Sequence, residues 1–276
     1  AGTIFVGGPA KFNQDINANN VQGISPEDYT QSISLLSNQD DFQFNVITMP
    51  GLNQSQHSTE VAQLINMCQE RGDAIAVVDL APINSTLLTY TGEAAELNSS
   101  YAAAYAPWLR VSDPGTGQLI WIPASTVIPG VYAFNDRVAE PWFAPAGLNR
   151  GGLSTVIKPE RKFTQSNRDT LYVGKVNPIA SFPNAGTVVF GQKTLQTKAS
   201  ALDRVNVRRL LIALKGFISQ VSDNLVFEQN SAATRNQFLG SVNPYLESVQ
   251  QRQGLYAFKV VMDDSNNTPD VIDRNQ

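Results

Sequence analysis

The sequence predicts a mixed α/β fold, with a sheet and flanking helices in the first half and a smaller helix-rich α/β region after it. Residues 74–80 are apolar except for Asp79, which is typical of a strand covered on both faces. Residues 58–71 place apolar side chains on one helical face directly before that strand. Residues 201–222 repeat the helical spacing over a longer stretch. Strand and helix signals in alternation favour a parallel sheet.

The elements before residue 74 follow from local signals. Ser25 and the acidic residues after Pro26 predict a helix that ends near Leu36. Residues 42–49 are rich in β-branched and aromatic side chains and predict a strand that stops at Pro50-Gly51. The next helix is expected to end at Gly72, since glycine accepts the left-handed conformation common after helices.

The middle of the chain is marked by turn residues. Residues 113–117, Asp-Pro-Gly-Thr-Gly, predict a tight turn, and residues 118–122 a short strand after it. A helix is expected within 124–137. Residues 140–152 contain repeated proline and glycine and are expected to be irregular.

Towards the end, four further elements are expected. Residues 180–186 are predicted to be a loop and 187–190 a strand. A second amphipathic helix is predicted over 236–250, and a strand over 255–262. We expect two packed regions, residues 1–98 and residues 99–276.

Composition narrows the class of protein. The net charge of −4 and the sequence pI near 5.1 argue against a general nucleic-acid binder. No apolar stretch approaches the roughly 18 residues that span a bilayer, so membrane insertion is not expected. Cys68 is the single cysteine, which fits assembly in a reducing cytoplasm. The chain starts without methionine, inside an expected strand at residues 1–8, and we expect it to be a fragment.

Catalytic motifs are sparse, and we predict that the protein is not an enzyme. His57 is the sole histidine and is expected to be an exposed loop residue, with no G-x-S-x-G elbow to supply a nucleophile. Gly7-Gly8-Pro9 matches neither dinucleotide nor P-loop spacing. The pairs Asp40-Asp41 and Asp263-Asp264 are expected to be solvated turn residues. No catalytic residue, metal or cofactor is predicted.

A basic stripe on the 201–222 helix is the most distinctive local feature. At about 100° per residue, Arg204, Arg208 and Lys215 fall within roughly 40° of one another, while Arg209 points elsewhere. Aligned cations on a rigid helix suit docking to an acidic protein surface. The other interpretation is that the helix is interior and its arginines pair with carboxylates of this chain.

The second half of the chain resembles the tail sheath proteins of contractile phages, especially the T-even-like branch. The similar stretches run in family order from about Ser99 to the C-terminus. They are residues 100–103, 105–108, 144–151 (APAGLNRG), 168–172, 177–178, 191–194, 203–210 (DRVNVRRL), 225–228, 234–235 and 266–275 (NNTPDVIDRN). Compared with the family, the usual N-terminal start and the strands beyond Asn275 are absent.

This resemblance implies an α/β core that assembles with itself into six-subunit rings, stacked as a helical sheath around an inner tube. It also implies contacts with the tail tube, baseplate and tail terminator proteins, and a place in the virion after assembly in the bacterial host cytoplasm. Neighbouring subunits would be linked by terminal strands that add to one another's sheets. The basic stripe would then face the tube or a neighbouring subunit, helped by Arg161, Lys162 and Arg168.

Two other functions remain open at this point. One is the sheath of a phage-like bacteriocin or of a secretion particle. The other is a flavodoxin-like or hydrolase-like α/β enzyme acting at the loops after Phe5 or Leu80, which requires a ligand crevice at the strand ends.

Overall fold

The computed structural model describes residues 26–274, and its central feature is a five-stranded sheet. The first four strands in spatial order are parallel, and the last is antiparallel to its neighbour. In that order they are β1 (Val46–Asn53), β2 (Ile75–Asp79), β3 (Ala102–Ala106), β7 (Val176–Phe182) and β8 (Gly186–Val189). The predicted parallel sheet is confirmed.

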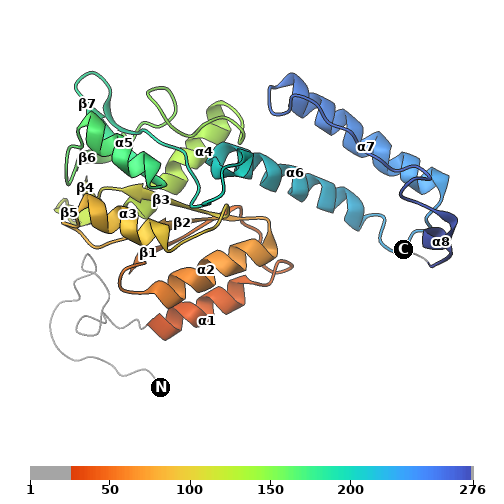
Figure 1. Ribbon diagram of the computed structural model, residues 1–276, viewed down its shortest axis with the longest axis horizontal. Coiled ribbons are helices and arrows are strands. Elements are labelled where there is room, and N and C mark those ends of the chain that lie inside the picture. The colour runs from red at the N-terminus through yellow and green to blue at the C-terminus, as the bar shows by residue number, and fades with distance from the viewer. Residues whose placement is uncertain (1–25, 275–276) are drawn as a thin grey trace. The chain divides into compact units, whose positions relative to one another are not determined.

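Helices pack around this sheet (Figure 1). Right-handed crossovers between neighbouring parallel strands place the helices after β1 and β2 on the same face. The helices concerned are α1 (Pro26–Leu36), α2 (Ser58–Arg71), α3 (Leu87–Ala95) and α5 (Gln165–Val173). Helix α2, which follows β1, contacts α1, and helix α3, which follows β2, contacts α5.

A second, antiparallel sheet is built around the predicted turn at Asp113. Its order is β5 (Leu119–Ile122), β4 (Leu109–Ser112) and β6 (Val156–Pro159). The Asp113 carboxylate accepts a hydrogen bond from the backbone N–H of Gly115, and Gly117 has a φ of 70°. The short helix η1 (Ala124–Thr126) and α4 (Ile128–Val138) then follow, and together they end one residue beyond the predicted helical range 124–137.

The chain divides into two compact units, Ala1–Arg209 and Leu210–Gln276. β2 and β3, which lie on either side of the predicted division between residues 98 and 99, pair within one sheet, and the two predicted regions stay a prediction. The strand expected at residues 1–8 lies outside the described residues.

The second unit is helical in its described part. It contains most of α6 (Val205–Asp223), then α7 (Ala232–Gln251) and α8 (Pro269–Asp273). The rings of Phe217 and Tyr245 stack between α6 and α7 with centroids 3.8 Å apart. The two long helices predicted for this part of the chain are confirmed.

Three predictions differ from the structure for identifiable physical reasons. β1 continues through Pro50-Gly51, because an edge strand tolerates a residue without an N–H donor. Ala180–Phe182 belong to β7 rather than to a loop, since they pair with β8. Residues 255–262 form no strand, because among residues 26–274 no other segment pairs with them.

A close backbone approach at Gly151 gives a first prediction. A Cβ added there would lie 2.7 Å from the Val189 carbonyl oxygen and 2.8 Å from the Gly147 nitrogen. Backbone atoms cannot yield as a flexible side chain does, so Gly151→Ala is expected to lower the free energy of unfolding by about 2 kcal/mol. Gly152→Ala is the matched control, because its Cβ would meet nothing within 4 Å. Equal denaturation midpoints for the two variants would contradict this packing argument.

Candidate functional site

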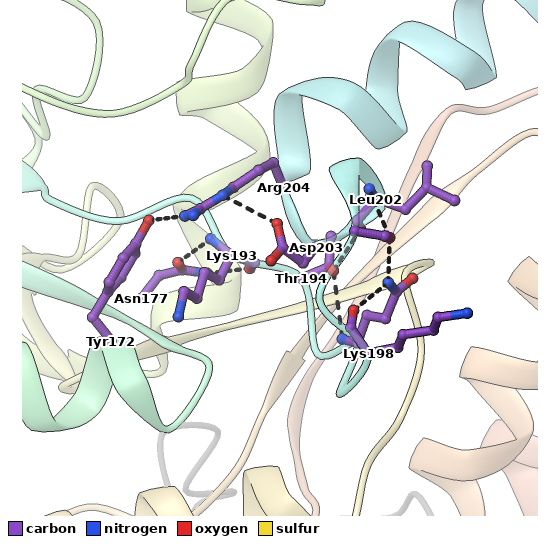
Figure 2. A network of polar contacts seen from close by, with 10 residues as sticks. Tyr172, Asn177, Lys193, Thr194, Lys198, Leu202, Asp203 and Arg204 are labelled. Carbon is purple, nitrogen blue, oxygen red and sulfur yellow. Dashed lines mark hydrogen bonds and ion pairs between the residues drawn. The ribbon is translucent and has the colours of Figure 1, made fainter.

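The first predicted stripe residue, Arg204, belongs to a polar network just before α6 (Figure 2). Its Nε lies 3.1 Å from the Asp203 carboxylate, and its guanidinium donates to the Tyr172 hydroxyl. Lys193 lies over the same tyrosine ring, with Nζ 4.5 Å from the centroid. Burial lowers the pKa of Lys193, with Arg204 adding to the effect. Arg204 is thus partly engaged within its own chain.

Arg208 is buried within the fold. The residue is only 6% exposed, its guanidinium lies 3.9 Å from the centre of the Tyr101 ring, and it donates to the Ser100 hydroxyl. Burial lowers the pKa of this arginine. The cation is therefore covered, and the stripe drawn from helical spacing is not continuous at the surface.

Arg209, which points away from the stripe as predicted, forms a two-pronged ion pair with Asp136 of α4. The two hydrogen bonds measure 2.9 and 2.6 Å, and the guanidinium lies 4.7 Å from the Tyr132 ring centre. Tyr132 in turn shares a 2.6 Å hydrogen bond with the buried Tyr105 of β3. Arg209 accordingly matches the other interpretation, in which an arginine of this helix pairs with a carboxylate inside the fold.

Asn177 holds the segment that leads from β8 towards α6, and sequence reasoning did not single it out as a site residue. Its amide nitrogen donates to the carbonyl oxygens of Ala104 and Lys193, and its oxygen accepts from the Lys193 N–H at 2.5 Å. Figure 2 shows this clasp beside the Arg204 network. The available signal was an asparagine within the otherwise apolar run of residues 176–180.

Arg168 on α5 borders a surface pocket of about 650 Å³. Its guanidinium lies 5.5 Å from the ring centre of Phe182 and 5.8 Å from that of Phe190. It also donates to the Phe163 carbonyl. Arg168 is half-buried, so part of its charge remains available at the pocket.

Arg161, Lys162 and Lys215 are exposed. The six predicted interface residues therefore fall into two groups. Arg161, Lys162 and Lys215 present their cations to solvent, while Arg168, Arg204 and Arg208 have contacts within the fold. Their role at an interface stays a prediction.

His57 is buried, and the prediction of an exposed loop histidine was wrong. Its Nδ1 accepts a hydrogen bond from the Asn53 N–H, because the loop folds back onto the end of β1. At the end of β2, the Asp79 carboxylate accepts from the N–H and hydroxyl of Ser125. The Trp108 indole donates to the Ala81 carbonyl nearby. These internal contacts occupy the strand end near Leu80, one of the two places where the enzyme hypothesis requires a ligand crevice, and the loop after Phe5 lies outside the described residues.

Two further searches of residues 26–274 bear on function. No group of three or more His, Cys, Asp or Glu side chains is placed to hold a metal ion there. In the same range, no helix combines the length and the apolar character needed to traverse a bilayer.

Comparison with known proteins gives consistent results along the chain. Residues 22–195 match the family model of the phage tail sheath protein central domain, and residues 197–276 that of the phage tail sheath C-terminal domain. The tail sheath protein of Enterobacteria phage T4 is 37% identical over 73% of this chain. That of Vibrio phage KVP40 is 41% identical over 56% of it. The chain spans 30% and 23% of the length of these two relatives.

Solved structures agree with the fold. The sheath complex of an extracellular contractile injection system, in the contracted state, is 26% identical with a TM-score of 0.72, over 88% of this chain and 68% of that one. A chain of the anti-feeding prophage baseplate has a TM-score of 0.74 at 23% identity, over 91% of this chain and 68% of that one. Both sheath domain models match in sequence order, and we conclude that the chain belongs to the phage tail sheath protein family.

Proposed function

We propose that the chain is part of a structural, non-enzymatic subunit of a contractile tail sheath. Hexameric rings of this subunit would stack around an inner tube and contract to drive the tube through the host cell envelope for genome ejection. The observation that carries the proposal is the succession of central and C-terminal sheath domains over residues 22–276. Its place would be the tail of the virion, after assembly in the host cytoplasm.

Contraction of this kind needs a rigid subunit that can occupy two packings, the contracted one lower in free energy. The first unit suits that role, since buried side chains such as Arg208 and Asn177 tie its elements together. A difference of about 2 kcal/mol per subunit, typical of coupling energies, becomes very large over many identical copies. No nucleotide or metal would be required.

Assembly would involve other copies of the subunit first, and then the tail tube, baseplate and tail terminator proteins. The β-patterned segment 255–262, which pairs with no described strand, supports linkage by strand addition. An unpaired strand-forming segment can supply its N–H and C=O groups to a neighbouring chain.

Electron microscopy of the full-length protein, purified after expression alone, tests the proposal. We expect cylinders of contracted-like geometry, because the lower-energy lattice is reachable without a tube. A protein that stays monomeric at every concentration and salt tested, or that turns over a substrate or holds a nucleotide, contradicts the proposal.

The exposed cations are proposed to grip the tube. Replacing Arg161, Lys162 and Lys215 with Gln is expected to leave the unfolding midpoint unchanged and to reduce tube-filled sheaths several-fold, since exposed ion pairs are individually weak. High salt should have the same effect on the unsubstituted protein. Lys198→Gln, at another exposed lysine, is the matched control. Normal sheathed tubes from the triple variant refute this role.

A second candidate is the sheath of a phage-like particle without a genome. The 26% identity and TM-score of 0.72 to the sheath of an extracellular injection system favour it. Particles purified from the native source separate the two, because a phage tail carries a DNA-filled capsid and an injection particle does not.

A further inference from the structure

The turn between α6 and α7 carries the most exposed apolar side chain among residues 26–274. Phe227 is 103% exposed relative to an extended reference, and its neighbour Val226 is also exposed. Phe227 has a φ of 72°, a backbone region that a bulky side chain rarely adopts without compensation. An outward-pointing ring held in an unfavourable conformation is a reason to look for a binding role. We call residues 225–228 the knob.

The first unit offers a recess of matching chemistry. The 650 Å³ pocket beside Arg168 is lined by Tyr172, Pro178, Phe182 and Phe190, among others. Phe182 and Phe190 meet edge to face, with centroids 5.3 Å apart, and Phe190 is half exposed. Aromatic rings of this kind accept a further ring in edge or offset stacking. The pocket is larger than one aromatic side chain.

Charge is complementary as well. Glu228 follows Phe227 in the knob and is exposed. The lining of the pocket supplies Arg168. Lys193 follows the lining residue Gln192 in the chain, and its Nζ lies 4.5 Å from the ring centre of Tyr172, which also lines the pocket. Asp169 opposes them as the acidic residue of the lining. A carboxylate one residue after the ring would meet this excess of cations at the rim.

We propose that the knob of one copy docks into this aromatic pocket of a second copy. Phe227 would insert between Phe190 and Tyr172, and Glu228 would pair with Arg168 at the rim. Knob and pocket are different surfaces of the same chain, so each copy can engage one neighbour through its knob and another through its pocket, as stacked rings require. This inference rests on the proposed function and names one of its subunit contacts.

Cysteine cross-linking of the full-length protein tests the contact directly. Val226→Cys and Gln165→Cys, the second on the exposed pocket rim, leave Phe227 and Phe190 in place. Mixed after separate purification, the two variants are expected to form a disulfide-linked heterodimer within the assembly. Cys68 is a silent background, since burial raises the pKa of its thiol to about 12. Leu88→Cys, at an apolar residue of α3 that is 80% exposed, replaces Val226→Cys as the control.

Truncation of the ring supplies the second readout. Phe227→Ala is expected to raise the protein concentration needed for cylinders about tenfold, as for a central aromatic anchor, and to abolish the 226–165 cross-link. Leu88→Ala is expected to change neither the assembly concentration nor the cross-link. Normal cylinders without the cross-link, or equal cross-linking through Leu88→Cys, overturn this inference alone. An unsubstituted protein that never assembles overturns the proposed function together with it.

Discussion

Replacing Asp136 with alanine is expected to lower the free energy of unfolding by about 3 kcal/mol, the low end for breaking a buried ion pair. The Arg209 side chain is 4% exposed, so its charge would stay buried after its carboxylate partner is removed. The Asp136 side chain is 30% exposed, so water can replace part of the lost contact, and the loss is expected at the low end of that range. Urea denaturation of the full-length protein, followed by circular dichroism, measures the loss.

Two further variants separate the cost of an unpaired buried charge from the cost of changing α4 in general. Arg209→Met combined with Asp136→Leu is expected to lose less than Asp136→Ala alone, because no unpaired charge remains. Arg137→Met removes a neighbouring exposed cation of α4 and is expected to change the free energy of unfolding by less than about 0.5 kcal/mol. If all three variants unfold at the same urea concentration, the ion pair does not stabilise the fold.

Replacing Asn177 with leucine is expected to cost about 3 kcal/mol as well. The substitution removes three hydrogen bonds and leaves the Lys193 N–H without the acceptor it has in the folded chain. A buried backbone group left unsatisfied costs about 1–3 kcal/mol, and each lost bond about 1 kcal/mol. Asn177→Asp keeps the acceptor but places a buried carboxylate oxygen against the carbonyl oxygens of Ala104 and Lys193, so it is expected to be at least as destabilising as Asn177→Leu.

Hydrogen exchange locates the effect of this substitution. Loss of the clasp should accelerate exchange of the Lys193 amide more than exchange within β2. Asn98→Ala is the control, since its side-chain oxygen accepts one bond from the Thr197 N–H at an exposed position. An unchanged exchange rate at Lys193 in Asn177→Leu would falsify the clasp.

The sheet was predictable because its signals are local. The apolar residues of β2 and the glycine after α2 each follow from a few neighbours, and both are found where expected. Helices α3 and α5 were not predicted, since each has only nine residues, which is too short for an apolar periodicity to stand out. Residues 255–262 show the opposite case. Their composition is typical of a strand, but a strand forms only with a pairing partner, and none is found among residues 26–274.

The basic stripe shows where periodicity stops being informative. Arg208 and Lys215 share a helical direction, yet Arg208 packs on Tyr101 and Lys215 is exposed. Seven residues separate them, about 10 Å along the helix axis, so the two positions meet different surroundings. A helical wheel gives the angle of a side chain, and tertiary packing decides what lies at that angle. The pocket at Arg168 was hidden for the same reason, since its aromatic walls come from separate segments.

The two adjacent arginines at the start of α6 have a mechanical consequence. Arg208 reaches the segment before β3, and Arg209 reaches α4, so they leave the helix about 100° apart. A helix tethered by one side chain can swivel about that tether, but two tethers in different directions resist torque as well as tension. The first turns of α6 are therefore a clamped end, and any bending under force is confined to the helix beyond them.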